Sequence, residues 1–471
     1  MFKRTGSGKL SVENNSAVVI GGGISGLTAA YRLQNSGYSV TVLEKSDRVG
    51  GAMYTHSQNG WLAEYGPNTI LESNTKIKNL ISKLELDEEK ISPGLVSSSR
   101  FIVKNKKLLP LPLSPAEFLT SPLFNWKSKF NILKEPFVSK WQNNYEESLS
   151  EFVQRRLGQN ILDYAINPFV AGVYAGDPQK LSAKHALPKL YQLEQDFGSL
   201  IKGQIKKAKL PVESDDIPRN MAKMFSFKNG LKVLPETLAS KLKTPVEFNA
   251  RVEKIQKLSE GWEITYNQKN EIKTQKADHL IYAGTGHQLA SFKIISDKVI
   301  DLSFGNEIEY PPVATLTLGF HKNQIQHDLN GFGLLVPEVE NLKILGTLFN
   351  SSLFPYRAPD DHVTITVYIG GVRQGELALE IEEKRLDIAL NDLTMLLGIS
   401  GSPAFTFHKK WTKSIPQYNV GYGDIKSKFQ CLEKDNPGLY FTGNYRKGIS
   451  VADTMLQAIQ TADNIINTNN H

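Results

Sequence analysis

A glycine-rich turn between a short strand and a helix is the feature that most restricts how this chain can fold. Residues 17–20 are apolar and partly β-branched, which is typical of a buried parallel strand. Gly21, Gly23 and Gly26 follow as Gly-x-Gly-x-x-Gly, and a helical pattern then runs to Gly37. Such glycines permit a tight turn, a close backbone approach to a pyrophosphate and close packing of helix on strand. The turn predicts a dinucleotide site, unless it merely packs a helix on a sheet.

An acidic residue and a second glycine turn follow that helix. Residues 39–44 read as the next strand, and it ends on Glu44, where a carboxylate can accept hydrogen bonds from ribose hydroxyls. Arg48 and the pair Gly50-Gly51 come next. A nicotinamide site has no need of a second turn, whereas a permanently held cofactor gains from another backbone approach and an arginine near its phosphates. The stretch therefore predicts a resident FAD, although Arg48 alone would be more typical of a solvated loop.

Length and composition exclude several other classes of protein. A chain of 471 residues has room for two or three domains. Its one cysteine, Cys431, cannot form an intrachain disulfide or a cysteine-based zinc site, and it fits a reducing compartment. The formal charge is +7, and no block of basic and aromatic residues suggests nucleic acid. An anionic membrane surface or an anionic substrate explains the excess as well.

Targeting, metal and acyl-transfer signals are also weak. No run of 18 apolar residues could span a bilayer, and the basic start of the chain predicts a short disordered leader rather than a secretion signal. None of the nine histidines lies in a His-Glu-x-x-His array or a clear triad. His287 and His408 are therefore expected to be structural or exposed, with no metal site.

Later segments predict a discontinuous cofactor domain. Residues 99–112 read as a hairpin with a turn at 104–106. Residues 146–182 read as helical, with a break into a loop at Pro168. Residues 244–284 alternate as a β-meander, and one helix is expected near 376–398. Near the end of the chain a strand is followed by Gly443 and Asn444 and then by a helix, which is the same strand, glycine turn and helix order as at the opening turn.

Residues 113–144 carry aromatic side chains with lysines among them. At helical spacing the segment places Trp126, Phe130, Leu133, Phe137 and Trp141, with a break expected before Pro136. This combination suits the headgroup layer of a membrane. From periodicity alone a helical pair packed on the core, with lysines on its wet face, is the favoured interpretation.

Four stretches together resemble the protoporphyrinogen oxidase family, flavoenzymes that aromatise the porphyrin ring in haem synthesis. They are PFVAGVYAGDPQKLS (168–182), GFGLLVP (331–337), LGTLFNSSLFPYRAP (345–359) and LYFTGNYRKGISVAD (439–453). The resemblance runs from residue 18 to 466, and the opening fingerprint is shared with the wider flavin-dependent amine oxidase superfamily. Residues 452–454 and 282–286 depart from the commoner motifs, which blurs the assignments around the flavin ring.

The resemblance implies an α/β fold in three parts. These are a discontinuous FAD-binding, Rossmann-like domain (14–95, 227–300 and 432–471), a mixed-sheet α+β substrate domain (96–112, 206–226 and 301–431) and a helical, membrane-contacting insertion (113–205). It also implies two sets of site residues. The cofactor set is Gly21, Gly22, Gly23, Ile24, Ser25, Gly26, Glu44, Lys45, Arg48, Gly50, Gly51, Gly66, Pro67, Asn68, Thr69, Val252, Trp411, Gly443, Asn444, Ile449 and Val451. The substrate set is Arg100, which would pair with a propionate, Gly172, whose carbonyl would face pyrrole N–H groups, Asn68 beside the ring, and Leu334, Leu348 and Phe349 as apolar walls.

The resemblance further implies a reaction and its partners. A porphyrinogen would lose six electrons to three molecules of dioxygen, giving hydrogen peroxide, with the flavin doing the chemistry and no side-chain nucleophile. Protoporphyrinogen IX, with two propionates, is expected rather than coproporphyrinogen III, with four, because residues 109–141 look like a lipid-contacting insertion. A peripheral position on the cytoplasmic face of the inner membrane, hand-off to ferrochelatase, a homodimer and no binding of nucleic acid are further expectations.

Two other classes of function remain open at this point. An amine or carotenoid-type flavin oxidase would share the opening fingerprint, but no aromatic cage can be located. Proteins like the GDP-dissociation inhibitors keep a similar architecture without flavin and are not enzymes. Such a binding protein would not need Arg48 with Gly50-Gly51 together with a late turn at Gly443.

Overall fold

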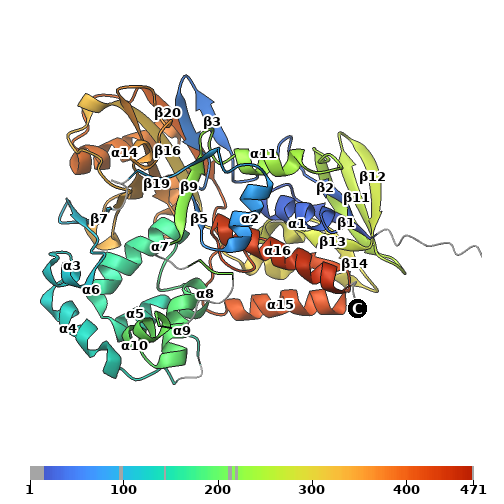
Figure 1. The fold of residues 1–471 in the computed structure, drawn as a ribbon, viewed down its shortest axis with the longest axis horizontal. Coiled ribbons are helices and arrows are strands. Elements are labelled where there is room, and N and C mark those ends of the chain that lie inside the picture. The colour runs from blue at the N-terminus through green and yellow to red at the C-terminus, as the bar shows by residue number, and fades with distance from the viewer. Residues whose placement is uncertain (1–14, 95–98, 143–144, 210–214, 218–220, 469–471) are drawn as a thin grey trace, which may run out of the picture.

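Three groups of secondary structure elements meet at the centre of the molecule (Figure 1). The computed structural model describes residues 15–94, 99–142, 145–209, 215–217 and 221–468. The predicted leader lies outside these residues except for its last two positions. In Figure 1 a parallel sheet with α1 and α16 lies to the right, a mixed sheet with α14 lies at the upper left, and a group of helices lies at the lower left.

The parallel sheet contains the opening glycine turn. Its strands, in order, are β2 (Ser39–Leu43), β1 (Ser16–Ile20), β13 (His279–Tyr282) and β21 (Leu439–Phe441), and all neighbouring pairs are parallel. The interior of the strands is apolar, so both faces can be buried. Three of the strands come from segments more than 150 residues apart, so this part of the fold is discontinuous, as the sequence predicts.

Each face of the parallel sheet has its own cover. Val19, Val42 and Ile281 share one core with α1 (Ile24–Gln34), α11 (Val233–Ser240) and α16 (Val451–Thr468). Side chains of the opposite face pack against a second sheet and α15 (Tyr422–Asp435). This second sheet runs β12 (Glu271–Ala277), β11 (Trp262–Gln268), β10 (Ala250–Lys257), β14 (Lys293–Ile295) and β15 (Val299–Ile300), and it contains the predicted meander.

The mixed sheet has seven strands. In order they are β20 (Phe405–Trp411), β16 (Val313–His321), β19 (His362–Gly370), β18 (Ile344–Leu348), β17 (Gly333–Leu335), β7 (Arg100–Lys104) and β8 (Lys107–Pro110). Only β7 and β17 pair in parallel. The predicted hairpin turn is confirmed, because Asn105 and Lys106 take φ values of 52° and 59° between β7 and β8. This is the pair of positive φ angles that a tight two-residue hairpin turn requires.

The helix predicted near 376–398 is in fact two helices, α13 (Gly375–Leu379) and α14 (Glu382–Leu397). The backbone becomes extended at Glu380 and Ile381, and the buried guanidinium of Arg385 donates to the carbonyls of Ala378 and Glu380. The periodicity continues across this break, so a pattern of apolar residues could not reveal it.

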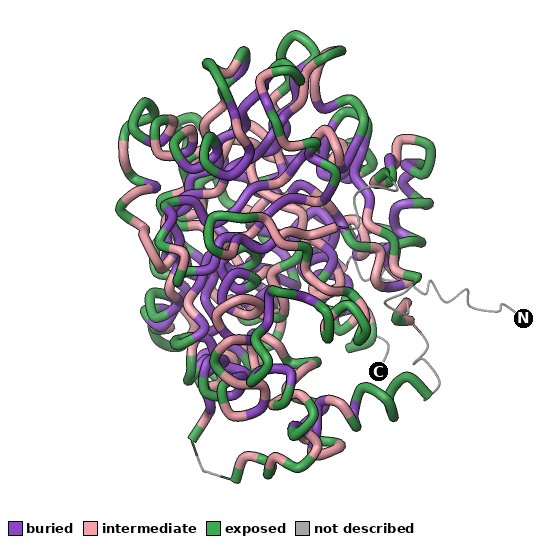
Figure 2. The backbone as a smooth tube through the Cα atoms, turned by 90° about the vertical axis from the view of Figure 1, so that its left-hand side faces the viewer, coloured by how far each residue is buried: buried purple, intermediate pink, exposed green. Residues whose placement is uncertain are grey.

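Smaller elements complete the sheets. They are the hairpin β3 (Thr55–Gln58) and β4 (Trp61–Glu64), the three-stranded sheet of β5 (Ile70–Glu72), β9 (Lys223–Phe227) and β6 (Lys90–Ile91), and the helices α2 (Thr75–Lys83) and α12 (Asn350–Leu353). Buried positions concentrate in the sheets at the centre, and exposed ones lie on the outer turns and helices (Figure 2).

The third group is helical. It contains α3 (Pro115–Thr120), α4 (Trp126–Lys134), α5 (Leu149–Arg156), α6 (Gln159–Ile161), α7 (Asn167–Tyr174), α8 (Ala183–Ala186), α9 (Pro188–Phe197) and α10 (Leu200–Lys207). The predicted break at Pro168 is wrong. A π-helical turn, Leu162–Ile166, runs directly into α7, so the chain stays helical through Pro168. The helix ends later, at Tyr174, where Ala175 takes a left-handed conformation.

A buried ion-pair network anchors α4 to this group. The helix ends before the 3-10 turn Glu135–Phe137, as predicted from Pro136. The fully buried Arg156 contacts the carboxylates of Glu135 and Glu194, and Glu135 also accepts hydrogen bonds from the hydroxyl of Ser199 and the N–H of Leu200 at the start of α10. Burying these charges is tolerable because each has a partner. The network fixes where α4 sits.

The division into three domains remains a prediction. The strands of residues 96–112 and 301–431 do share one sheet. The predicted boundary at 431/432 falls within α15, however, and the one at 205/206 falls within α10.

Candidate functional site

The first glycine turn has the geometry of an anion site. The N–H of Gly21 donates to the carbonyl of Leu43 at 2.8 Å, and φ is +112° at Gly21. A Cβ on Gly26 would lie 1.9 Å from the carbonyl oxygen of Gly21, so only glycine allows this packing of α1. A Cβ on Gly23, the N-cap of α1, would meet no described atom within 4 Å. Backbone at a helix N-terminus therefore faces open space, as a pyrophosphate requires.

Glu44 is held in place at the end of β2. Its carboxylate accepts hydrogen bonds from the N–H of Gly22 at 2.6 Å and from the N–H and hydroxyl of Ser46 at 2.9 and 2.6 Å. Oε1 accepts both bonds from Ser46, whereas Oε2 accepts only the bond from Gly22 and has capacity for a further donor, such as a ribose hydroxyl. Lys45 is next to it, and burial lowers the pKa of that ammonium group. Val252 lies two residues along β10 from Ala250, whose N–H donates to the backbone carbonyl of Glu44 at 2.9 Å.

The second glycine turn lies against the first. The N–H of Gly50 donates to the carbonyl of Gly22 at 2.8 Å, and a Cβ on Gly51 would lie 3.7 Å from the Cα of Gly23. Arg48 donates to the carbonyls of Val49 and Gly51, both at 3.1 Å. Its guanidinium also lies 4.4 Å from the ring centre of Tyr54. These contacts hold Arg48 against the second glycine turn and place its positive charge next to Gly51.

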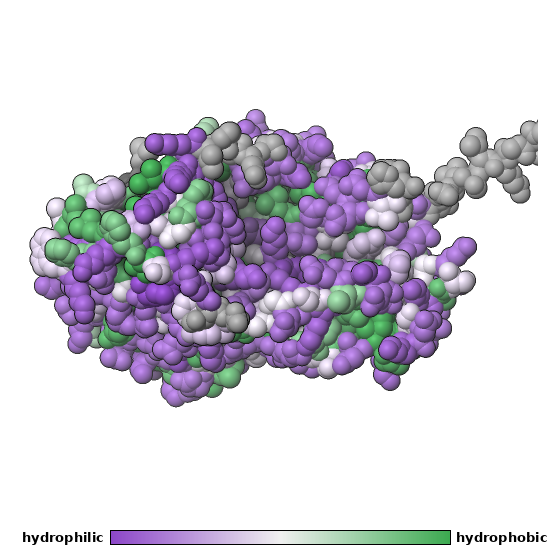
Figure 3. Space-filling view, turned by 90° about the horizontal axis from the view of Figure 1, so that it is seen from below, coloured by the Kyte–Doolittle hydropathy of each residue, from purple (hydrophilic) through white to green (hydrophobic). Residues whose placement is uncertain are grey.

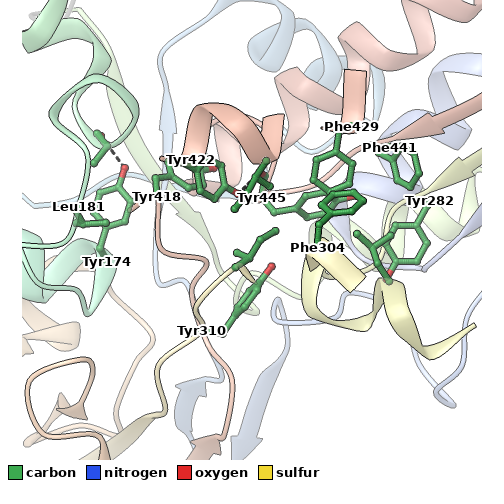
Figure 4. Packing of buried hydrophobic residues seen from close by; sticks show 14 of the residues in the cluster. Tyr174, Leu181, Tyr282, Phe304, Tyr310, Tyr418, Tyr422, Phe429, Phe441 and Tyr445 are labelled. Atoms are coloured by element: carbon green, nitrogen blue, oxygen red, sulfur yellow. Dashed lines mark hydrogen bonds between the residues drawn. The ribbon is translucent and has the colours of Figure 1, made fainter. Parts of the chain in front are cut away.

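The late turn reaches the same place from the other end of the chain. The hydroxyls of Ser25 and Thr442 are 3.2 Å apart, and Gly443 takes a φ of +144°. Asn444 accepts a hydrogen bond from Tyr418, which belongs to a buried aromatic cluster with Tyr422, Tyr445, Phe429 and Phe441 (Figure 4). Ile449 precedes α16, and Val451 is its first residue. The predicted cofactor residues of the two chain ends are therefore neighbours in space.

The turn at residues 66–69 connects these glycine turns to the mixed sheet. The indole N–H of Trp411 donates to the carbonyl of Tyr65 at 3.0 Å. Asn68 donates to the carbonyl of Gly66 at 3.2 Å and to the hydroxyl of Tyr368 at 2.9 Å. A Cβ on Gly66 would lie 2.8 Å from the carbonyl oxygen of Ala52, so this turn packs tightly behind the second glycine turn.

One face of the mixed sheet carries a flat, glycine-lined strip, which we call the glycine floor. In one row the strand register places Arg100 beside Gly333 and Gly333 beside Leu348. In the neighbouring row it places Leu335 beside Gly346 and Gly346 beside Tyr368. Residues paired across strands share a face, so neither glycine adds a side chain to this strip, and Leu335 reaches over Gly346, where a Cβ would lie 3.1 Å from its Cδ2. Such a floor suits a flat apolar ligand.

Helix α7 lies across this floor. A Cβ on Gly172 would lie 2.5 Å from Cδ2 of Leu335, which shows how closely the helix approaches β17. Ala171 and Ala175 of the same segment pack with Leu345 and Tyr368. The structure thus brings Arg100, Gly172 and Leu348 to one side of the sheet. Asn68 is connected to the same side by its hydrogen bond to the hydroxyl of Tyr368.

Leu334 and Phe349 do not line this face, so their prediction as walls of the site is not supported. Both belong to the core on the opposite face, under α14, with exposed fractions of 1% and 0%. Because successive strand residues point to opposite faces, Leu334 and Leu335 cannot both reach the floor. The sequence missed Leu335, Leu345 and Tyr368. The two-residue alternation of these strands is visible in the sequence, but it does not show which of the two faces lies toward the site.

A buried carboxylic acid supports the turn, and sequence analysis also missed it. Glu64 accepts hydrogen bonds from the hydroxyl of Thr55 at 2.7 Å and from the N–H of Leu231 at 2.8 Å. Burial raises the pKa of Glu64 from 4.5 to about 7, while these hydrogen bonds and the charges of Arg357 and Lys232 act in the opposite direction. The side chain joins β4, just before the turn at residues 66–69, to the segment that leads into α11.

The described residues contain neither a metal-binding cluster nor a membrane-spanning helix. Among the described residues, no group of three or more histidine, cysteine, aspartate or glutamate side chains could hold a metal ion. No helix in the described part of the chain is long and apolar enough to cross a membrane.

Known proteins similar to this chain fall into one broad group. A family model described as flavin containing amine oxidoreductase matches residues 24–466. The chain is 35% identical to protoporphyrinogen oxidase 2, chloroplastic/mitochondrial, of Arabidopsis thaliana, over 97% of this chain and 94% of that protein. It is 27% identical to coproporphyrinogen III oxidase of Bacillus subtilis (strain 168), over 93% of this chain and 95% of that protein.

Solved structures agree with the fold. A protein of Exiguobacterium sp. 255-15 superposes with a TM-score of 0.79 at 22% identity, covering 97% of this chain and 99% of that one. Reduced UDP-galactopyranose mutase superposes with a TM-score of 0.73 at 15% identity, covering 97% and 95%. At these identities the likeness concerns the fold alone. It confirms the predicted α/β class with its mixed sheets.

We predict that Glu64 makes stability fall as pH rises from about 4.5 to about 7. In that window the folded state keeps a proton that the unfolded state has lost, so rising pH favours unfolding, by at most about 3 kcal/mol. Glu64→Gln should remove this slope in thermal unfolding measured from pH 5 to 8. Glu236→Gln, an exposed change on α11, should keep it. A Glu64→Gln protein with the slope of the unmodified chain would contradict the assignment.

Proposed function

The chain belongs to the flavin containing amine oxidoreductase family, with FAD as its cofactor, and we propose that it oxidises protoporphyrinogen IX to protoporphyrin IX with dioxygen as the acceptor. The observation that carries the proposal is the glycine floor, which has Arg100 at one edge and is joined to the turn at residues 66–69 by the hydrogen bond from Asn68 to Tyr368. Relatives named as porphyrinogen oxidases match nearly the whole chain, which supports the same substrate class.

The residues present fit FAD. The open space at Gly23 would receive the pyrophosphate at the start of α1, and Glu44 would accept from the ribose hydroxyls. Arg48 would neutralise negative charge beside Gly50 and Gly51. The turn at residues 66–69 and Trp411 would flank the ring, because both connect the glycine turns to the mixed sheet. Bound FAD supplies the acceptor for a hydride from the substrate.

The chain itself binds and orients the macrocycle. A porphyrinogen loses six hydrogens as it becomes a porphyrin, four from its bridging carbons and two from its nitrogens, and three dioxygen molecules leave as three hydrogen peroxides. The glycine floor would support the flat ring between Leu335, Leu348 and α7. Arg100, at one edge of the floor with its guanidinium 4.9 Å from the ring centre of Phe332, would pair with a propionate carboxylate.

An exposed apolar surface favours the less polar substrate. Four side chains of α4 and the 3-10 turn have large exposed fractions, namely Trp126 at 74%, Phe130 at 62%, Leu133 at 65% and Phe137 at 85%. We call these four residues the α4 surface. The alternative of a helical pair with these side chains packed on the core is therefore wrong. Apolar side chains gather at this end of the molecule (Figure 3).

The surroundings of the α4 surface fit a lipid headgroup layer. Lys127, Lys134 and Lys140 are exposed beside it. Lys129 is instead turned inward, and its ammonium group donates to the carbonyls of Leu119 and Ser121 at 2.7 and 3.0 Å. Aromatic residues flanked by lysines bind a bilayer interface without spanning it. The position on a cytoplasmic inner face, ferrochelatase hand-off and a homodimer stay predictions.

Comparing two porphyrinogens tests the proposed substrate. We expect the yellow, FAD-loaded protein to oxidise protoporphyrinogen IX faster, at equal concentration, than coproporphyrinogen III, because the α4 surface favours a substrate that partitions into lipid. Porphyrin fluorescence measures both rates, and peroxide should form in a 3:1 ratio to porphyrin. Faster turnover of the four-propionate substrate would favour coproporphyrinogen III oxidation instead, and a lack of both activities would overturn the function.

Arg100→Ala is predicted to raise KM for protoporphyrinogen IX by about tenfold or more while the flavin content stays normal. A charge-assisted hydrogen bond to a carboxylate contributes roughly 1.5–3 kcal/mol, which accounts for such a change. Arg100→Lys should recover part of the affinity, since it keeps the charge but loses the planar fork. An unchanged KM in the alanine variant would exclude the carboxylate-pairing role.

Removing aromatic side chains from the α4 surface should weaken membrane binding. We expect Phe130→Ser with Phe137→Ser to bind vesicles of phosphatidylglycerol and phosphatidylethanolamine at least about tenfold more weakly in co-sedimentation, because each buried ring contributes roughly 1.5–3 kcal/mol. Ile272→Ser, which removes a 60% exposed side chain from β12, is the matched control and should leave binding unchanged. Equal vesicle binding by all three proteins would contradict the membrane role.

A further inference from the structure

We propose that the hydroxyl of Tyr368 is a substrate contact that serves a macrocycle nitrogen both before and after oxidation, and that Asn68 and Asn350 orient it. The inference rests on the proposed function and extends it to a residue that the sequence motifs did not single out. The position of Tyr368 on the glycine floor, a chain of hydrogen bonds and one unpaired buried oxygen support it.

The hydrogen-bond chain runs from α12 to the floor. The amide of Asn350 donates to the Oδ1 of Asn68 at 2.8 Å, and the amide of Asn68 donates to the hydroxyl oxygen of Tyr368 at 2.9 Å and to the carbonyl of Gly66. Asn68 and Asn350 are buried, with exposed fractions of 8% and 5%. Each is therefore fixed by its partners, and the oxygen of Tyr368 has one of its two lone pairs occupied from the side of the cofactor turn.

Two groups of this chain have hydrogen-bonding capacity that the protein does not use. Within the described residues, the hydroxyl of Tyr368 donates to no acceptor, and the buried Oδ1 of Asn350 accepts from no donor. Buried polar atoms are almost always paired, so an unpaired one beside a site indicates a missing ligand or water. Tyr368 is only partly buried, although its strand β19 lies inside the mixed sheet between β16 and β18.

A hydroxyl group suits a nitrogen that changes its hydrogen-bonding character. A porphyrinogen has four pyrrole N–H donors, whereas a porphyrin has two N–H donors and two imine-type nitrogens that accept. The free lone pair of Tyr368 can accept from a pyrrole N–H, and after that proton has gone its O–H can donate to the same nitrogen. Leu335, Leu345 and Leu348 beside it can do neither.

The proton balance leaves Tyr368 unchanged. Each two-electron oxidation would remove a hydride from a bridging carbon, for which bound FAD would be the acceptor, and a proton from a nitrogen or carbon to solvent. Tyr368 contributes hydrogen bonds and neither gains nor loses a proton overall. Burial, and then the charge of Glu64, raise the pKa of this phenol, so it stays neutral throughout the ordinary working range. Its effect should therefore be independent of pH.

The test removes one oxygen atom from the FAD-loaded protein. We expect Tyr368→Phe to lower kcat for protoporphyrinogen IX about five- to tenfold, by the same factor from pH 6 to 9, with KM within about twofold and an unchanged flavin content and visible spectrum. Tyr174→Phe is the matched control, because it removes a phenol that donates to the carbonyl of Ala186 within the helical group. That variant should keep the kcat of the unmodified enzyme.

A second variant separates orientation from simple packing. Asn350→Ala should lower kcat in the same direction, since Asn68 loses its support, and the double variant should be no slower than Tyr368→Phe alone. Additive losses, or unchanged kcat in Tyr368→Phe, would overturn the inference while leaving the proposed function intact. Loss of flavin from Tyr368→Phe would also overturn it, because the hydroxyl would then hold the cofactor. If the unmodified enzyme oxidised no porphyrinogen, the proposed function itself would fail.

Discussion

The close approach of backbone segments at the glycine turns is the constraint on which the rest of the structure depends. Gly50 donates to Gly22 at 2.8 Å, and the hydroxyls of Ser25 and Thr442 are 3.2 Å apart, although these residues come from three parts of the chain. Side chains at Gly21, Gly26 or Gly50 would collide with backbone atoms or distort the turn. This approach sets where β1, β13 and β21 lie, and with them the edge at which a dinucleotide can bind.

Glycines also allow a close approach of neighbouring segments in the mixed sheet. Gly333 and Gly346 lie in adjacent rows of one face, so neither adds a side chain to this strip of the sheet. Helix α7 comes close to that strip because Gly172 has no Cβ to collide with Leu335. The cofactor turns and the glycine floor are joined by the hydrogen bonds of Asn68 and Trp411. Close packing at glycines therefore shapes both halves of the proposed site, and the hydrogen bonds of Asn68 and Trp411 connect the two halves.

Elements whose sequence patterns span only a few residues were predicted correctly. The opening strand, turn and helix, the hairpin turn at Asn105-Lys106 and the late strand and helix lie where their patterns predict them. Predictions failed where the same short pattern is compatible with two different structures. Pro168 was taken as a break, but a π-helical turn precedes it and the helix continues through it to Tyr174. Leu334 was predicted as an apolar wall, but it packs in the core under α14, because alternation puts Leu334 and Leu335 on opposite faces without saying which face is the site.

By itself the sequence determined the dinucleotide turn, the second glycine pair and the succession of strands and helices, because each depends on residues only a few positions apart. Only the tertiary structure decided which face of the mixed sheet meets the cofactor turns, that β7 pairs in parallel with β17, and that the α4 surface is exposed rather than packed. It also decided that Tyr368 meets Asn68, a residue 300 positions away. Such contacts depend on how whole sheets pack against each other, and no short pattern of residues carries that information.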